Sequence, residues 1–280
     1  ISMCYSTAEY ITMSPDSIRF WNPTNLAFKR CITDPGFFSN FCVFDSLKLL
    51  AVATTKRQLL FYELENLTRL PVEVSASPTS KDIKKMSIEE AKQTLHFLNG
   101  SNMPLGNVPQ TICSADDLNK PNDYTKIFFV GDDSGIIEVF KIKIPMRRRG
   151  TDYLINRIAR TVMHKGGVNQ ISPIDTLKCY ASCSMDHTVK FWNFIDSRSG
   201  SCGTFTVLRT FNDNLGPILG FNFSPYQKII VTYGNSRDAY VWALSPPRKL
   251  FKLGGHYSLI QSITDFITSN DEKYVLTITN

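Results

Sequence analysis

Short apolar runs, some of them alternating with polar residues, recur along the whole chain, and they predict β-strands. Examples are EYITMS at 9–14, LLAVATT at 49–55, IFFVGDD at 127–133 and YASCSMD at 180–186. They are rich in β-branched and aromatic residues, and turn-forming residues such as glycine, aspartate and serine separate them. The pattern therefore predicts an all-β protein with antiparallel strands joined by tight turns.

Five of these runs lead into a second strand that ends on an aromatic residue, and the endings mark an internal repeat. The endings are Trp21 in SPDSIRFWN, Tyr62 in TKRQLLFYE, Phe140 in DDSGIIEVF, Trp192 in MDHTVKFWN and Trp242 in SRDAYVWA. Each repeat also contains an upstream apolar stretch and, before it, an outer strand, which in the third repeat is RLPVEV at 69–74. Repeats of roughly 40 to 50 residues with four antiparallel strands are typical of the blades of a β-propeller.

The segment VMHKGGVNQISPIDTLKCYASCSMDHTVKFWNF at 162–194 resembles the WD-repeat family. In that family a buried network of His, Ser or Thr, Asp and Trp cross-links the blade. The resemblance implies such a structural network for His164, Ser182, Asp186 and Trp192. A His-Asp-Ser set also suggests nucleophilic catalysis, but these residues stand at the positions that cross-link a blade, so we assign them a structural role.

The other repeats depart from the family pattern. Only His164 and His256 stand where the family has its histidine. The Asp that ends the family's repeat is replaced by Asn22, Glu63, Lys141, Asn193 and Ala243. We therefore expect strand pairing and apolar packing to hold the other blades together.

The repeat endings divide the chain into blades. We expect residues 1–280 to form part of one WD-repeat β-propeller of four-stranded antiparallel blades, incomplete at both ends. The expected boundaries are a partial blade at 1–22, blades ending near 63, 141, 193 and 243, and a partial blade at 244–280. A ring of this type typically has about seven blades.

A loop and helix insertion is predicted at 75–107, between the loop compositions SASPTS and GSNMPLGN. Ser87 and Glu90 form a capping box, and apolar residues follow at helical spacing, so we expect one short helix over 88–99. Leu95 and Leu98 on its apolar stripe are candidate partner-binding residues. They serve equally well to fold the helix back onto the blade.

The formal charge of +6 arises from 31 basic and 25 acidic residues, and the excess is concentrated at 141–160. Arg147, Arg148 and Arg149 are expected in a loop, and Arg157 and Arg160 in the outer strand that follows it. These five are candidate partner-binding residues, because arginine pairs with carboxylates and with phosphates. A solvated basic loop without a partner explains them equally well.

Catalytic and cofactor motifs are missing from the sequence, including the Walker, HExxH and GxSxG patterns. We expect no enzymatic activity, no catalytic, cofactor-binding or metal-binding residues, and no cofactor. Seven cysteines lie in strand-like segments without a CxxC pair; Cys179 and Cys183 have a spacing that suggests a metal site, but buried thiols explain them better. We therefore expect a reduced, intracellular protein. Membrane contact is not expected, since no apolar run approaches the roughly 20 residues of a spanning helix.

Together these features predict a protein-interaction scaffold in a large multiprotein assembly. The segment LLAVATTKRQLLFYEL, followed by a long inserted loop, is similar to large multi-propeller WD-repeat proteins of cilia and flagella. That similarity implies a cytoplasmic, cytoskeletal or axonemal assembly, with tubulin or another acidic surface as partner. The alternative is a propeller associated with RNA or ribosome assembly that uses the 141–160 basic segment. Few aromatic residues lie among these arginines, which favours protein over nucleic acid.

Overall fold

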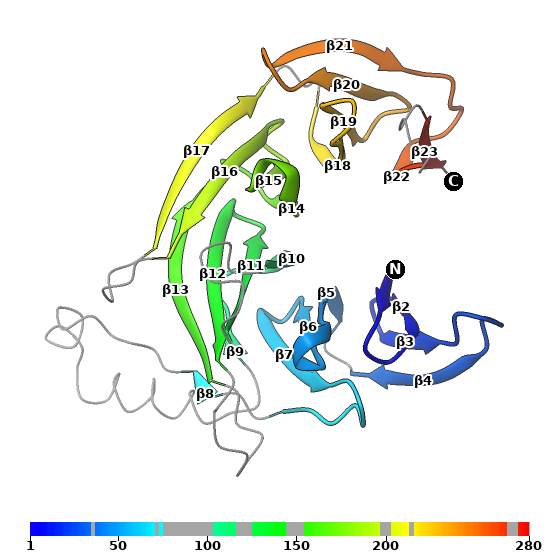
Figure 1. Ribbon diagram of the computed structural model, residues 1–280, viewed down its shortest axis with the longest axis vertical. Coiled ribbons are helices and arrows are strands. Elements are labelled where there is room, and N and C mark those ends of the chain that lie inside the picture. The colour runs from blue at the N-terminus through cyan, green and yellow to red at the C-terminus, as the bar shows by residue number, and fades with distance from the viewer. Residues whose placement is uncertain are drawn as a thin grey trace, which may run out of the picture. The chain divides into compact units, whose positions relative to one another are not determined.

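The computed structural model describes most of the chain, in nine ranges. They are residues 1–34, 37–70, 73–74, 103–115, 125–143, 154–196, 203–212, 216–267 and 274–279. Two compact units are present, residues 1–130 with 138–160 and residues 131–137 with 161–280. Within the described ranges the regular structure is β-strand, with two 3₁₀ turns (Figure 1). The predicted all-β class is confirmed.

Sheets of consecutive strands make up the first unit. The first sheet contains β1 (Ser2–Cys4), β2 (Glu9–Met13), β3 (Ser17–Trp21) and β4 (Phe28–Thr33). The second contains β5 (Phe38–Phe44), β6 (Leu49–Thr54), β7 (Gln58–Glu63) and β9 (Met103–Pro104). The third contains β10 (Pro109–Ala115), β11 (Thr125–Asp132), β12 (Ile136–Lys143), β13 (Leu154–Val162) and β8 (Glu73–Val74), and its turn between β11 and β12 belongs to the second unit.

The second unit repeats the same arrangement. One sheet contains β14 (Val168–Ile174), β15 (Cys179–Ser184), β16 (Val189–Ile195) and β17 (Thr204–Phe211). The next contains β18 (Ile218–Ser224), β19 (Ile229–Gly234), β20 (Ala239–Ala243) and β21 (Arg248–Leu253), and β22 (Ile260–Ile267) pairs with β23 (Tyr274–Thr279). Each aromatic repeat ending lies in the third strand of its sheet. The fourth strand therefore follows the ending, and the sequence repeat is offset by one strand from the sheet.

Strand β6 shows why its sequence is apolar throughout rather than alternating. All six of its residues are buried. Leu49, Ala51 and Ala53 pack in a cluster with the β10–β13 sheet, whereas Leu50 and Val52 pack with the β1–β4 sheet. A strand that is buried on both faces becomes a continuous run of apolar residues.

The turns between first and second strands repeat a lysine in an unusual conformation. Asp45–Leu47 and Asp175–Leu177 form the 3₁₀ turns, and Lys48 and Lys178 follow them with φ of 52° and 48°. Each lysine donates its backbone N–H to the carbonyl of the aspartate three residues earlier, at 3.1 Å. This bond offsets part of the cost, about 1 kcal/mol, of a left-handed side-chain-bearing residue.

Two expectations differ from the structure or lie beyond it. RLPVEV does not form the outer strand of the second sheet: Arg69 makes only an isolated bridge to Tyr62, and β8 pairs in parallel with β13. The fourth strand there is β9, at the end of the insertion that was expected to be loop. The predicted helix at 88–99, with Leu95 and Leu98, lies outside the described residues.

In the described part of the chain, no helix has the length and apolar character needed to cross a bilayer.

Candidate functional site

A glycine turn between β11 and β12 positions the main chain of His164. Gly135 has φ of +88°, and its carbonyl accepts hydrogen bonds from the N–H groups of Met163 and His164, each at 3.0 Å. A Cβ atom on Gly135 would lie 2.2 Å from the His164 carbonyl oxygen. Glycine is therefore required here both for its backbone conformation and for the space it leaves.

Ser182 connects His164 to Trp192. Its Oγ lies 2.8 Å from Nε2 of His164 and accepts a hydrogen bond from Nε1 of Trp192 at 3.0 Å. All three residues are at most 1% exposed. Because Ser182 lies in β15 and Trp192 in β16, these bonds tie the segment before β14 to the middle of its sheet.

Asp186 holds the opposite side of the imidazole. Nδ1 of His164 lies 3.1 Å from Oδ2 of Asp186. The carboxylate also accepts hydrogen bonds from the backbone N–H of Lys165 at 2.9 Å and from the N–H and Oγ1 of Thr188 at 3.0 and 2.6 Å. Asp186 thus joins the β15–β16 turn to the segment before β14. We call His164, Ser182, Asp186 and Trp192 the His164 network.

Burial fixes the charge state of this network. It lowers the pKa of His164 to about 4, and the attraction of the Asp186 carboxylate does not compensate. Burial raises the pKa of Asp186, but hydrogen bonds from Thr188 and Lys165 outweigh it and leave that pKa below its usual value. At neutral pH the imidazole is therefore neutral and the carboxylate ionised. Nδ1–H then donates to Asp186, and Nε2 accepts the hydroxyl proton of Ser182.

This arrangement is a cross-link within the sheet. The Ser182 hydroxyl donates to His164, accepts from Trp192 and is 0% exposed. A nucleophilic oxygen has to reach a substrate, and its base has to be free to take up a proton. The geometry of the His164 network meets neither condition.

Simpler forms of the same cross-link occur in two other sheets. Trp21 donates its Nε1–H to Oγ1 of Thr12 at 2.8 Å, and Trp242 donates to Oγ1 of Thr232 at 2.9 Å. Where Tyr62 and Phe140 replace tryptophan, the residue ten positions earlier is Val52 or Val130. A repeat that ends in tryptophan thus has a hydroxyl residue at or next to this position to accept the indole N–H, and a repeat that ends in tyrosine or phenylalanine has valine there. Our sequence analysis missed Thr12 and Thr232, although they lie nine and ten residues before their tryptophans, close to the ten residues between Ser182 and Trp192, and this spacing was a usable signal.

His256, the other histidine at the family position, also contacts a hydroxyl. Its Nε2 lies 2.7 Å from Oγ1 of Thr277 in β23. Thr277 is opposite Ile263 in the β22–β23 pair, as Ser182 is opposite Ile171 in the β14–β15 pair. The two histidines therefore serve equivalent positions of their sheets.

The candidate arginines fall into two groups. Arg147, Arg148 and Arg149 lie outside the described residues. Arg157 and Arg160 lie on β13, with side chains that are 54% and 51% exposed. Both approach Oε1 of the buried Glu138 on β12, at 3.1 and 3.3 Å. Glu138 lies just before the 141–160 segment, so the segment's charge is smaller in the folded protein than its sequence suggests.

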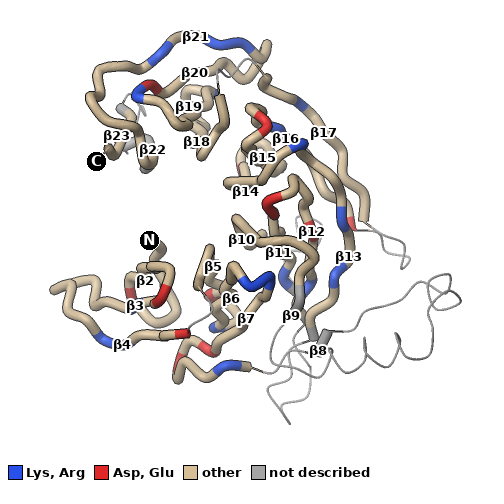
Figure 2. Tube along the Cα trace, turned by 180° about the vertical axis from the view of Figure 1, so that it is seen from behind, with Lys and Arg blue, Asp and Glu red and all other residues tan. Residues whose placement is uncertain are grey.

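Basic residues also occur on fourth strands that the sequence analysis did not single out. Strands β4, β13, β17 and β21 contain eight Lys and Arg residues and no Asp or Glu (Figure 2). On β4, Lys29 and Arg30 bind the buried Glu9 at 2.8 and 2.6 Å. On β21, Lys252 lies 3.1 Å from Asp238. These ion pairs leave the outermost strand positive while they anchor it to the strands behind it.

Cys179 and Cys183, which have the spacing of metal ligands, lie in an apolar cluster on β15. Burial raises the pKa of Cys179 to about 11 and also raises that of Cys183. Metal binding requires the thiolate, which burial disfavours here. Among the described residues, no group of three or more His, Cys, Asp or Glu side chains could hold a metal ion.

Comparisons with known proteins agree with this geometry. Residues 156–193, which include the whole His164 network, match the family model described as WD domain, G-beta repeat. A chain in a solved structure titled "Crystal Structure of Mitotic Checkpoint Complex" aligns with a TM-score of 0.59 and 13% identity. The alignment covers 92% of the present chain and 66% of that one, so the present chain spans just under two thirds of its length. Curated proteins gave no match. At this identity the structural likeness shows the fold alone.

Proposed function

We propose that this chain, a member of the WD-repeat β-propeller family, is a non-enzymatic scaffold that binds other proteins in a large cytoskeletal or ciliary assembly. Interaction between proteins is the general role of WD-repeat propellers. The finer assignment rests on one observation, the positive charge that the 141–160 segment and the fourth strands share. The solved chain that it resembles also comes from a complex.

The charge of these strands favours an acidic partner. Three of the four, β4, β17 and β21, are the last strands of their sheets, and among the described residues no further strand of the sheet lies beyond them. Basic side chains there remain substantially exposed even when paired, as with Lys252 at 57% and Lys29 at 43%. Exposed pairs of this kind contribute little to stability, about 0 to 1 kcal/mol, and exchange partners readily. An acidic protein surface such as that of tubulin would attract them over a distance of about 8 Å at physiological salt.

A phosphate backbone is the competing acidic partner, as in the RNA and ribosome-assembly alternative. Salt distinguishes the two. Binding to nucleic acid weakens log-linearly with salt, and its slope approaches the number of phosphates neutralised. A protein partner gives a shallower dependence, since fewer counterions are released.

The test is affinity-purification mass spectrometry of the full-length protein from its native cell. Wild type is compared with a variant that carries Arg147→Glu, Arg148→Glu and Arg149→Glu. The matched control reverses three exposed basic residues elsewhere, Lys56→Glu, Lys228→Glu and Arg237→Glu. We expect tubulin or axonemal proteins to be lost from the arginine variant and retained by the control. Recovery of RNA and ribosome-assembly factors, or equal loss from both variants, would contradict the proposal.

A further inference from the structure

A hollow of about 460 Å³ lies between the first strands of two neighbouring sheets in the second unit. One wall is the end of β14 with the 3₁₀ turn that follows it, and the other is the end of β18 with its following turn. Its size falls in the range of about 300 to 1,000 Å³ that is typical of ligand pockets. A few residues of an extended peptide would fill it.

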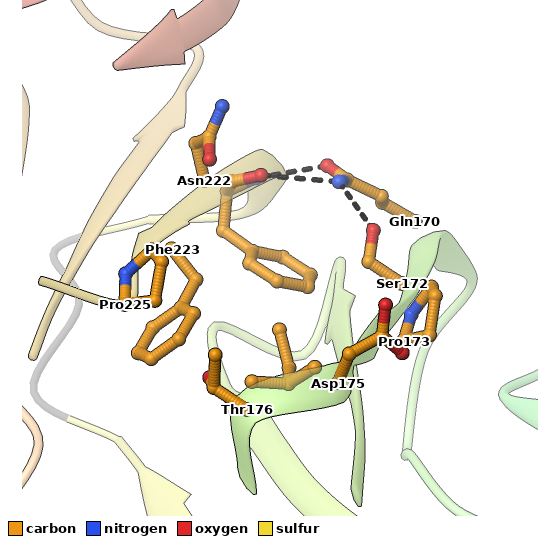
Figure 3. Close-up of a pocket in the computed structure, with 10 residues that line it drawn as sticks. Gln170, Ser172, Pro173, Asp175, Thr176, Asn222, Phe223 and Pro225 are labelled. Carbon is orange, nitrogen blue, oxygen red and sulfur yellow. Dashed lines mark hydrogen bonds between the residues drawn. The ribbon is translucent and has the colours of Figure 1, made fainter. Parts of the chain in front are cut away.

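Gln170 fixes the distance between the two walls. Its Nε2 donates to the Phe221 carbonyl at 3.0 Å and to Ser172 Oγ at 2.9 Å, and its Oε1 accepts the Phe221 N–H at 2.9 Å. The amide thus bonds to both main-chain groups of Phe221, as a neighbouring strand would (Figure 3). Asn169 adds a bond from Nδ2 to the Ile218 carbonyl at 2.7 Å. The hollow is therefore held open between fixed walls, and a ligand would not have to order them first.

The lining combines an apolar floor with a single charge. Phe221 and Ile174 are buried at the bottom, and Phe223 is half-buried. Pro173 and Pro225 are exposed at opposite edges of the hollow (Figure 3). The other lining residues are polar and uncharged, except for Asp175. In Figure 3 the Thr176 side chain lies beside Phe223, whereas the Asp175 side chain lies on the Pro173 side of the hollow.

The carboxylate of Asp175 is available to a ligand. It is exposed, it does not cap its own turn, and within the described residues it forms no hydrogen bond or ion pair. Asp45 occupies the same position in the β5–β7 sheet, but its carboxylate accepts a hydrogen bond from the Ser6 N–H at 2.9 Å and one from Cys4 Sγ at 3.4 Å. The comparison shows that the turn itself does not need an unpaired carboxylate.

We propose that this hollow binds an extended segment of a partner protein, with an Arg or Lys side chain of that segment paired to Asp175. The aliphatic stem of the basic residue and an apolar neighbour would lie against Phe223 and the two prolines, while the charged head remains at the wet rim. An acidic side chain is excluded, because Asp175 is the only charge in the lining and would repel it. The chain as a whole is positive and attracts acidic partners, whereas the local negative charge of Asp175 favours a basic side chain at this position.

This proposal deepens the scaffold function by naming the chemistry of a second partner. It rests on that function but not on the arginines at 147–149, which lie elsewhere in the sequence. A failure of the arginine variant in cells would neither support nor contradict binding at the hollow, because the hollow has its own test on purified protein.

The experiment is selection of a displayed library of random heptapeptides on the purified full chain. We expect Arg or Lys beside an apolar residue to be enriched on wild type. Fluorescence polarisation with the most enriched peptide should then show binding that Asp175→Asn weakens about five- to tenfold. Asp175→Lys should reverse the selection and enrich Asp or Glu at the same position. Asp45→Asn, at the equivalent turn, is the control and should select the same peptides as wild type.

The outcomes that overturn the proposal are equally definite. Selection on wild type that shows no preference for basic residues would do so, and so would a preference that survives both Asp175 variants. Tryptophan fluorescence of each variant in a Trp21→Phe background verifies that the two sheets remain folded, because Trp192 lies in one of them and Trp242 in the other.

Discussion

Acidification should destabilise the second unit through His164 alone before it affects any carboxylate of the His164 network. The imidazole is buried and neutral in the folded chain, with a pKa of about 4 against an ordinary value of 6.5. Above pH 6.5 it is neutral in both the folded and the unfolded states, and its contribution to stability is complete. Between pH 6.5 and 4 only the unfolded chain takes up the proton, so the free energy of unfolding falls.

The size of this effect follows from the two pKa values. Their difference corresponds to about 3 kcal/mol, of which most is lost by pH 4 and the small remainder just below it. Asp186 affects stability only at lower pH than His164 does. Its pKa is lowered from 3.8, so its contribution is present at every pH above that value and disappears only at lower pH. The loss of stability caused by His164 and the loss caused by Asp186 therefore occur in different pH ranges.

Urea unfolding between pH 7 and 4 measures the effect. A Trp21→Phe background restricts the fluorescence to Trp192 and Trp242, which both lie in the second unit. His164→Gln should be less stable than its parent by about 1 to 3 kcal/mol at pH 7, because polar groups of the network lose their partner. The difference between the two proteins should shrink as the pH falls from 6.5 to 4.

A parent protein whose unfolding free energy stays constant from pH 7 to 4 would refute the reasoning. So would a His164→Gln variant that shows the same pH dependence as the parent, since other groups would then be responsible. The imidazole proton shifts in NMR spectra of the folded protein give an independent value of the His164 pKa.

Three other predictions concern stability, measured by thermal unfolding of the full chain. Gly135→Ala should cost at least about 2 kcal/mol, because the new Cβ meets the His164 carbonyl and the backbone has a positive φ; an unchanged melting temperature would show that the turn relaxes. Ser182→Val should cost about 2 to 4 kcal/mol, since it leaves Nε2 of His164 and Nε1 of Trp192 buried without a partner. A cost below about 0.5 kcal/mol, as for a typical surface substitution, would contradict this. Glu138→Gln should cost less than about 1 kcal/mol, because its partners Arg157 and Arg160 on β13 are half-exposed. A larger loss would show that these ion pairs stabilise the strand more than their exposure indicates.

The sequence predicted those features that depend on local pattern. The third strands were located by their aromatic endings, because an alternating strand and its turn residues are neighbours in the chain. The members of the His164 network were identified together because they lie within one repeat of known pattern. Thr12 and Thr232 were missed because their repeats lack the histidine and aspartate that drew attention to Ser182.

Features that depend on distant partners were not predictable in this way. The fourth strand of the second sheet, β9, follows some 40 residues after β7 and has only two residues, so neither its length nor its composition distinguishes it from a loop. The pairing of Glu138 with Arg157 required knowledge of which strand faces which. A count of charges along the chain therefore overestimated the positive field of the 141–160 segment.

The bond between Gln170 and Phe221 gives the second unit a built-in reporter for hydrogen–deuterium exchange. The Phe221 amide proton is held by a side chain of the neighbouring sheet, at 2.9 Å, rather than by a strand of its own sheet. Its protection therefore measures how often the two sheets separate, whereas the amides paired within β18 and β19 measure how often one sheet opens. A single deuterium-labelling time course on this chain would resolve the two motions from each other.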